Sequence, residues 1–297
     1  MRRAAAGKQI VPAVSGGRDS MALLHAFARV APGSVVAVAT FDHGTGPAAT
    51  RAADLVASEA AKLGFPVVVG HAASQGASEA DWRQARREFL MDVTDRTGGL
   101  VATAHTRDDQ VETVLMRVLR DAGARGLAGL YAASRTMRPF LDCTRDEVAE
   151  YADEVGANWV EDPTNASMRY FRNRVRRDLL PALARVKPGF DQQLIGLARE
   201  AGVWREKLDA LVAPLAQVSA TGRSVFVAVG DLSIYSREEL SSVWPAIAAR
   251  VGLAMDWRGT ERAAAFTNES RTGARMQLSG GWEISRTRDA FELRRWR

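Results

Sequence analysis

The sequence predicts an α/β fold over roughly its first two thirds: a parallel, twisted sheet with helices on both faces. Short and almost wholly apolar segments recur at residues 10–14, 35–39, 67–69 and 100–104, and segments with helical spacing lie between them. Strands of this composition are buried on both faces, which is typical of parallel sheets. A turn rich in glycine and serine follows the first segment, at the carboxyl end of the strand, where such sheets bind their ligands.

The expected helices follow from the spacing of apolar residues. The first covers residues 21–30, directly after the glycine-rich turn, and others are expected over about 50–63 and 108–120. Pro12 lies inside the first strand. Because proline has no backbone N–H, we expect it only where no neighbouring strand needs that donor.

The character of the chain changes after about residue 183. Lys187-Pro188-Gly189 predicts a break, and residues 190–212 predict a helix long enough to connect two domains. We expect three parts, with these boundaries: a first domain of residues 1–186, a helical linker of residues 187–217 and a small α+β domain of residues 218–297.

The small α+β domain is predicted from several short strands and one helix. The helix is expected around residues 237–251. The strands are expected at residues 225–229, 275–278, 282–285 and 291–293.

Composition excludes several classes of protein. Hydrophobic residues make up 46% of the chain and charged residues 25%, which are globular values rather than those of a disordered or coiled-coil chain. The longest stretch without charge, residues 63–78, is too short and too polar to cross a bilayer. The apolar run after the basic start is also too short for a secretory signal. We therefore expect a cytoplasmic protein without a membrane partner.

The counts of cysteine, histidine and charged residues limit which metals and which partners the chain is expected to bind. A single cysteine, Cys143, and four histidines cannot form an intramolecular disulfide or a structural Cys/His zinc site, so a metal would be a hard ion bound by oxygen. The net charge of +5 mildly favours a polyanionic partner.

The most informative motif is Ser15-Gly16-Gly17-Arg18-Asp19-Ser20, which we call the glycine turn. It offers backbone N–H groups without Cβ atoms in the way, hydroxyls at both ends and the N-terminus of a helix, and these together suit a phosphate. Ser-Gly-Gly alone is explained equally well as a turn with serine and aspartate capping. The turn lacks the Gly-Lys-Ser/Thr of a Walker A loop. The whole string resembles the loop of the ATP pyrophosphatase superfamily, which cleaves ATP between its α and β phosphates.

Three further strings accompany the glycine turn. Residues 105–113, His-Thr-Arg-Asp-Asp-Gln-Val-Glu-Thr, open a helix after the strand candidate at 100–104, so Asp109 and Glu112 share one helical face. Acids that favour a helix N-terminus are the commoner explanation for either one alone. The other strings are Leu115-Met116-Arg117 with Arg120 ahead of a glycine-rich stretch, and Asp162-Pro163-Thr164-Asn165 followed by residues 170–176 and Leu179-Leu180-Pro181.

Together these strings resemble the bacterial tRNA-isoleucine lysidine synthetase family over residues 10–183, as a short-form member. The resemblance implies an adenine nucleotide alpha hydrolase-like fold, with residues 1–186 as the PP-loop catalytic domain. It also implies a ligase reaction. ATP adenylates the C2 carbonyl oxygen of the wobble cytidine in a CAU anticodon of tRNA(Ile), and the ε-amine of free lysine then displaces AMP. Mg²⁺ is implied beside ATP, and a homodimer is left open.

The resemblance assigns roles to individual residues. Asp19 is implied to hold Mg²⁺, Asp109 and Glu112 to bind lysine, and Arg83 and Arg86 to act at the adenylate. The residues implied to bind ATP are Ser15, Gly16, Gly17, Arg18, Asp19, Ser20, Asp42, His43 and His105. Those implied to bind RNA are Arg117, Arg120, Tyr170, Arg172, Asn173, Arg174, Arg176 and Arg177. A solvated helix face is the alternative for Arg83 and Arg86, and exposed charge without a partner for the run of arginines that begins at Arg169.

Lysine chemistry poses a proton problem. The ε-amine has a pKa near 10.4, so about one lysine in a few thousand is nucleophilic at pH 7, and a carboxylate that binds the ammonium raises that pKa further. We therefore expect one of Asp109 and Glu112 to orient the amine and the other to accept its proton.

The sequence departs from the family pattern at three places. Thr45-Gly46-Pro47 replaces the usual Leu-Arg, Arg87 replaces a tyrosine, and Asp121 stands where glycine is common. Two alternative functions stay open. A tRNA thiolase of the same superfamily generally needs paired cysteines, which this chain lacks, and a catalytically inactive RNA-binding relative would release no pyrophosphate.

Overall fold

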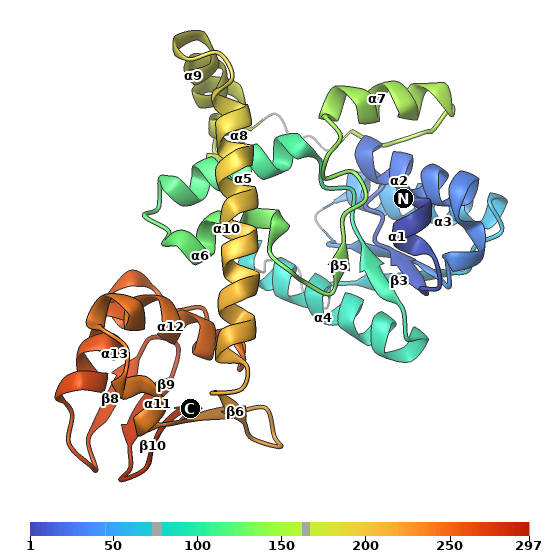
Figure 1. Ribbon diagram of the computed structural model, residues 1–297. Coiled ribbons are helices and arrows are strands. Elements are labelled where there is room, and N and C mark those ends of the chain that lie inside the picture. The colour runs from blue at the N-terminus through green and yellow to red at the C-terminus, as the bar shows by residue number, and fades with distance from the viewer. Residues whose placement is uncertain (45, 73–78, 162–166, 297) are drawn as a thin grey trace. The chain divides into compact units, whose positions relative to one another are not determined.

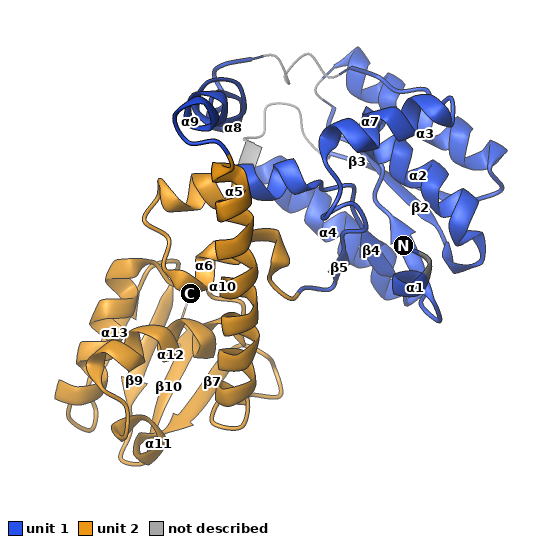
Figure 2. Cartoon of the chain, turned by 45° about the horizontal axis from the view of Figure 1, so that its top comes forward, with its two compact units in different colours: residues 1–112, 134–188 blue, residues 113–133, 189–297 orange. Residues whose placement is uncertain are grey.

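The computed structural model describes residues 1–44, 46–72, 79–161 and 167–296 (Figure 1). Thr45 and the Asp162-Pro163-Thr164-Asn165 string therefore lie outside the described residues. The chain forms two compact units (Figure 2). Unit 1 comprises residues 1–112 and 134–188, and unit 2 comprises residues 113–133 and 189–297. In the part of the chain that is described, no helix is long and apolar enough to span a membrane.

The sheet of unit 1 is parallel throughout, which confirms the predicted fold class. Strand β1 (Ile10–Pro12) pairs with β4 (Leu100–Ala102), and β4 pairs with β5 (Thr136–Met137). Strand β2 (Val38–Asp42) pairs with β3 (Val67–His71). Isolated parallel bridges between Ile10 and Val35 and between Ala13 and Ala39 join the two groups. The resulting order is β3-β2-β1-β4-β5.

Pro12 lies between these two bridges. On the β4 side its strand is complete, because the next residue, Ala13, donates its N–H to the Ala102 carbonyl at 2.8 Å. On the β2 side Pro12 has no N–H to add to a ladder. The pairing of β1 with β2 accordingly consists of separate bridges, which explains how a proline is tolerated inside this sheet.

The helices of unit 1 cover the parallel sheet. Helix α2 buries Met21, Leu24 and Phe27 completely, in the same core cluster as Val148 and Ala152 of α7. The longer helices are α2 (Arg18–Val30), α3 (Pro47–Lys62), α4 (Glu79–Thr97), α5 (Arg107–Val118, whose last turns belong to unit 2) and α7 (Arg145–Glu154). The shorter ones are α1 (Arg2–Ala5), η1 (Pro32–Ser34), α8 (Phe171–Arg174), η4 (Val175–Leu179) and α9 (Leu180–Val186).

The segment from α8 to α9 contains a π-helical turn, η4. The Leu180 N–H donates to the Val175 carbonyl, five residues back rather than four. Pro181 is the physical cause, because it has no N–H and its ring crowds the carbonyl of the residue four positions earlier. The widened turn is where Arg176 lies.

Unit 2 is a small α+β domain with an antiparallel sheet in the order β6-β7-β10-β9-β8. Alternate residues of the sheet, including Val225, Ile284 and Phe291, are buried in one cluster with Trp244 of α12. The strands are β6 (Gln217–Val218), β7 (Ser224–Ala228), β8 (Arg275–Leu278), β9 (Trp282–Arg286) and β10 (Ala290–Arg295). The helices are α6 (Ala124–Leu127), η2 (Gly129–Tyr131), α10 (Phe190–Val212), α11 (Val229–Ser233), α12 (Arg237–Ala249) and α13 (Trp257–Glu269).

The two units divide the chain differently from the three parts expected from sequence. Residues 187–217, expected to be a separate linker, belong almost wholly to unit 2, as do residues 113–133. The physical reason is that α10 holds the earlier segment. Arg125 donates to both carboxylate oxygens of Asp209, at 2.6 and 3.1 Å, and the Arg199 guanidinium lies 5.5 Å from the Tyr131 ring centroid.

The glycine turn leads from β1 into α2 and passes very close to α3. Gly16 has a φ of +81°, and a Cβ atom there would lie 2.8 Å from both the Cβ and the carbonyl oxygen of Ala52. At Gly17 the nearest atom to such a Cβ is 3.9 Å away, and its φ of −80° suits any residue. The fold therefore requires glycine at position 16, whereas position 17 has room for a larger residue.

We predict that Gly16→Ala lowers the free energy of unfolding by about 2 kcal/mol or more, because a left-handed alanine costs about 1–2 kcal/mol before any clash is counted. Gly17→Ala is the matched control and should cost less than about 1 kcal/mol. Urea denaturation of the two variants measures the difference. Equal losses would contradict the close approach to Ala52.

Candidate functional site

The glycine turn lies at the carboxyl end of β1 and is closed by Ser20. The Ser20 hydroxyl accepts from the Ser15 N–H at 3.1 Å and donates to the Gly17 carbonyl at 2.8 Å. The Gly16 carbonyl accepts from the Val160 N–H at 2.9 Å. These hydrogen bonds hold the turn on both sides. The turn leads directly into α2, and the N-terminus of a helix favours an anion.

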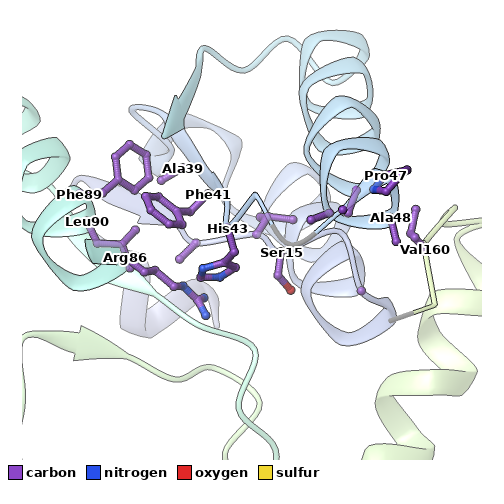
Figure 3. Close-up of a pocket in the computed structure, with 16 residues that line it drawn as sticks. Ser15, Ala39, Phe41, His43, Pro47, Ala48, Arg86, Phe89, Leu90 and Val160 are labelled. Carbon is purple, nitrogen blue, oxygen red and sulfur yellow. The ribbon is translucent and has the colours of Figure 1, made fainter. Parts of the chain in front are cut away.

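A pocket of about 600 Å³, the first pocket, lies beside the glycine turn (Figure 3). Its lining includes Ser15 and Gly17 of the turn and an aromatic wall of Phe41, His43 and Phe89. The Phe41 ring centroid lies 5.0 Å from that of His43 and 5.4 Å from that of Phe89. A cavity with an aromatic wall and, at its edge, a glycine turn suited to phosphate fits a nucleoside joined to phosphates.

Arg83 and Arg86 both lie on α4, but only one of them borders the cavities. Arg86 lines the first pocket and also a second pocket that adjoins it. Burial lowers the pKa of the Arg86 guanidinium, and the positive charge of Arg83 lowers it further. Arg83 itself is exposed, as is Arg87, the residue that departs from the family pattern. Of the two arginines expected to act at the adenylate, Arg86 is therefore the one that borders the cavities.

Asp42 and His43 have different surroundings. Asp42 is buried and holds the turn after β2, because its carboxylate accepts from the Gly44 N–H at 2.8 Å and from the Thr50 hydroxyl at 2.9 Å. His43 lines the first pocket. Of the two residues expected near the nucleotide, His43 therefore borders the cavity and Asp42 shapes the loop beside it.

A second pocket of about 440 Å³ adjoins the first. It shares Ala13, Ser15, Gly17, Arg86 and Val160 with the first pocket. Its further lining includes Arg18, Asp19, Ser20, His105, Asp109, Arg145, Arg176 and Arg177. Residues from the glycine turn and from the start of α5 thus face one cavity, as expected for the carboxyl edge of a parallel sheet.

Two titratable groups of the second pocket are perturbed chiefly by burial. Burial raises the pKa of Asp19, against the lowering effect of Arg145. Burial lowers the pKa of His105, against the raising effect of Asp109, which favours the neutral imidazole. The His105 Nδ1 atom lies 2.8 Å from the Thr103 hydroxyl, which orients the ring.

Asp109 and Glu112, the acid pair, lie together at the start of α5 and are surrounded by three guanidinium groups. Arg145 reaches both carboxylates through Nη2, at 3.2 and 3.1 Å. Arg172 donates to Asp109 at 2.8 Å and to Glu112 at 2.7 Å. Arg176 donates to both oxygens of Glu112, at 2.6 and 3.0 Å. Two negative charges thus meet three positive ones.

This neutralisation keeps the acid pair ionised. Burial alone would raise the pKa of Asp109, but Arg172, the Thr106 N–H and Arg145 outweigh it and hold the pKa below its usual value. Burial would also raise the pKa of Glu112, yet Arg176, Arg172 and Arg145 lower it overall. The side chain of Glu112 is 1% exposed, whereas that of Asp109 is 13% exposed and lines the second pocket.

The structure separates the residues expected to bind RNA into two groups. Four are engaged inside their own unit. Arg172 and Arg176 bind the acid pair, Asn173 is buried and donates to the Ser167 carbonyl at 2.8 Å, and Arg117 donates to the Gly126 carbonyl. The exposed residues are Arg120, Tyr170, Arg174 and Arg177, together with Arg169.

Sequence reasoning did not single out Arg145. Thr144 caps α7 by a capping box with Glu147, so the Thr-Arg-Asp-Glu string marks a helix start that a search for such boxes finds. That signal places Arg145 at the first position of a helix. It does not reveal that the side chain turns toward α5, 33 to 36 residues away in sequence.

Comparisons with known proteins agree with this geometry. A family model described as a PP-loop domain matches residues 2–183. A tRNA(Ile)-lysidine synthase from Thermobifida fusca is 41% identical over 222 residues, which are 71% of this chain and 67% of that protein. One from Salinispora tropica is 36% identical over 287 residues, 92% of this chain and 83% of that protein. The chain spans half the length of the Solibacter usitatus relative.

A solved structure with a similar fold is the U34-tRNA thiolase NcsA from Methanococcus maripaludis. Its TM-score is 0.56 at 18% identity, over 66% of this chain and 72% of that chain, so the likeness concerns the fold alone. The relatives named above by sequence are tRNA(Ile)-lysidine synthases. Since the PP-loop model covers more than half of the chain and the sequence matches extend into unit 2, this protein belongs to the tRNA(Ile)-lysidine synthase family.

Proposed function

We propose that this protein is a C–N ligase that joins free lysine to the wobble cytidine of a tRNA(Ile) with a CAU anticodon. In the first step the C2 carbonyl oxygen of cytidine attacks the α phosphorus of ATP, and the bond to pyrophosphate breaks. In the second step the lysine ε-nitrogen attacks C2, and the C2–O bond to AMP breaks. The products are lysidine, AMP and pyrophosphate.

The observation that carries the proposal is the content of the second pocket. Ser15, Gly17 and Asp19 of the glycine turn line it together with Asp109 of the acid pair. A phosphate chain held by the turn and an amine held by Asp109 would therefore share one cavity. Proximity of this kind is the main requirement for transferring an activated group to a nucleophile.

The nucleoside of ATP fits the first pocket, with its base against Phe41 and Phe89 and its phosphates at the glycine turn. Arg86 borders both pockets and so lies where the α phosphate would join the nucleoside to the phosphate chain. Ser15, Gly17, Arg18 and Ser20 line the pockets and would surround the phosphates, while Gly16 would fix the shape of the turn against Ala52. His43 and His105 would border the nucleotide from either side.

Mg²⁺ is part of the proposal, and Asp19 is the residue that would hold it. Among the residues that the structure describes, no three histidine, cysteine or acidic side chains form a cluster suited to a metal. One carboxylate beside a phosphate-binding turn is nonetheless the ligand set of an Mg²⁺ bound mainly through its nucleotide. The ion would neutralise charge on the phosphates, while Asp19 fixes its place against the turn.

Lysine would bind through Asp109, the acid that borders the cavity, with buried Glu112 supporting it. Because three arginines already contact the acid pair, the ammonium must replace a guanidinium contact. Both acids are weak bases at pH 7. The ammonium has no lone pair, so it must first release one proton to water, and only a small fraction of the lysine does so at pH 7. Once the C–N bond begins to form, the nitrogen of the resulting amine becomes strongly acidic, so a weak base suffices to accept its second proton.

RNA contact is proposed for the exposed basic and aromatic side chains. Arg174 and Arg177 are exposed near Tyr170, which is itself 38% exposed, and Arg120 is exposed on the other unit. Arginine binds phosphate in a bidentate manner and an aromatic ring stacks on an unpaired base. Arg117, Arg172, Asn173 and Arg176 would support the RNA-binding segments from inside. Action on tRNA implies a cytoplasmic protein, and light scattering would test for the homodimer that the resemblance leaves open.

We predict that the purified chain transfers labelled lysine to a tRNA(Ile) transcript with a CAU anticodon in the presence of ATP. Asp109→Asn and Glu112→Gln should each lower the rate of transfer by about 100-fold, because each removes a charge that orients or deprotonates the amine. ATP binding, measured separately, should stay within about threefold.

Asp92→Asn is the control, since Asp92 lies exposed on α4 in an ion pair with Arg96. Normal transfer by both amide variants would contradict the role of the acid pair. Pyrophosphate release followed by sulfur transfer would indicate a thiolase, and RNA binding without pyrophosphate release would indicate an inactive relative.

We predict that the acid pair makes stability depend on pH. The folded pKa of Glu112 lies below its unfolded value, so its contribution is complete above about pH 4.5 and is lost as the pH falls through the folded pKa. The stability difference between the wild type and Glu112→Gln should therefore shrink below about pH 4, by up to about 1.4 kcal/mol per pH unit. Urea titrations from pH 7 to pH 3 measure this, and a constant difference would contradict it.

We predict that Arg174→Gln weakens RNA binding to a similar extent for every sequence tested. One lost phosphate contact should lower the slope of log affinity against log salt by about one. Filter binding at several salt concentrations measures the slope. Arg96→Gln on α4 is the control, because Arg96 is paired with Asp92 within its own helix. An unchanged slope for Arg174→Gln would place the RNA elsewhere.

A further inference from the structure

Arg145 stands apart among the residues around the acid pair. It is the first residue of α7, and its backbone N–H donates to Asp108 Oδ2 at 2.8 Å. Its Nη2 atom contacts Asp109 at 3.2 Å and Glu112 at 3.1 Å. One residue thus binds three acids in the first turns of α5, through its backbone and its side chain together.

The three arginines that contact the acid pair are attached differently to unit 1. Arg172 and Arg176 lie on the short α8 and on the π-helical turn η4, with side chains 36% and 32% exposed. The side chain of Arg145 is 20% exposed. Its helix, α7, packs in one core cluster with α2, the helix that begins at the glycine turn. Arg145 therefore connects the acid pair to the element that carries the turn.

Arg145 also borders the second pocket, beside Ser15, Gly17 and Asp19. A single nitrogen of the planar guanidinium, Nη2, makes both carboxylate contacts. The same residue also lines the cavity. A guanidinium can present several N–H groups in fixed directions, which an ammonium on a flexible chain cannot. The side chain is thus placed between the phosphate side of the cavity and its acidic side.

We propose that Arg145 is a positioning residue for the lysine-transfer step, because its guanidinium holds the acid pair in place relative to the glycine turn. The inference rests on the proposed function and adds to it a residue that lies in none of the sequence strings on which the family resemblance rests. Arg145 acts through Asp109 and Glu112 rather than on the reacting atoms. Loss of its guanidinium should leave adenylate formation intact and let the acid pair move out of line with the activated cytidine.

The test separates the two steps of the reaction. Pyrophosphate released in a single turnover with ATP and CAU-anticodon tRNA(Ile), without lysine, reports adenylate formation. Labelled lysine appearing in RNA reports transfer. For Arg145→Gln we expect pyrophosphate release within about threefold of wild type and transfer slowed about 100-fold, the effect of a reacting group misplaced by about 1 Å. The loss should fall on kcat for lysine more than on KM.

Two further variants exclude a merely structural explanation. Arg145→Lys keeps the positive charge on a flexible chain in place of the planar guanidinium and should recover transfer by about tenfold over Arg145→Gln. Arg29→Gln is the matched control, because Arg29 joins α2 to Glu154 of α7 at 2.9 Å on the exposed side of the same helix pair, away from both pockets. Its two steps should match those of the wild type.

Several results would overturn the inference. Equal loss of both steps in Arg145→Gln, with a lowered melting temperature and no recovery in Arg145→Lys, would show a structural role alone. Wild-type transfer by Arg145→Gln would show that the residue is idle. If Arg145→Gln does not fold, Arg145→Lys decides alone: slowed transfer with intact adenylation supports the inference, and two unchanged steps overturn it. Adenylation without any lysine transfer by the wild type would overturn the proposed function and this inference with it.

Discussion

The need of two carboxylates, buried Glu112 and partly buried Asp109, for positive partners organises unit 1. An isolated carboxylate in a protein interior costs several kcal/mol, and removing one partner from a buried ion pair is strongly destabilising. Asp109 and Glu112 are stabilised by guanidinium groups from α7, α8 and η4. Because of these contacts α7, α8 and η4 lie at one end of α5, although each is more than 30 residues away from Glu112 in sequence. The same attraction that stabilises the charges builds one side of the second pocket.

Local backbone features place the arginines for this purpose. The capping box of Thr144 and Glu147 starts α7 so that the next residue, Arg145, directs both its N–H and its side chain at α5. Pro181 widens the helix before it into a π turn, where Arg176 donates to both oxygens of Glu112. Each feature is a short-range consequence of the sequence, yet its result is a contact more than 30 residues away.

On the opposite side of the cavity the constraint is steric rather than electrostatic. Gly16 has a left-handed φ and lies against α3 with no room for a Cβ atom, so the glycine turn takes one shape. Ser20 closes that shape by hydrogen bonds. A fixed turn at the N-terminus of α2 and a charged cluster at the start of α5 thus face each other across the carboxyl edge of the sheet, which is the arrangement the proposed transfer reaction requires.

The sequence by itself determined the parallel sheet, the glycine turn, the family and the shared helical face of Asp109 and Glu112, because these depend on short-range patterns: runs of buried residues, turn residues and three-residue spacing. The sequence predicted the bounds of α10 and β8 to the residue. It did not predict β5 or α13, because the sequence pattern of each is short or mixed. Only the tertiary structure decided which charges meet. The run of arginines from Arg169 to Arg177 looks uniformly solvated in sequence, yet helix periodicity turns Arg172 and Arg176 inward and leaves Arg174 exposed. A buried charge pairs with groups that lie near it in the folded structure, and a local sequence pattern does not show which residues those are.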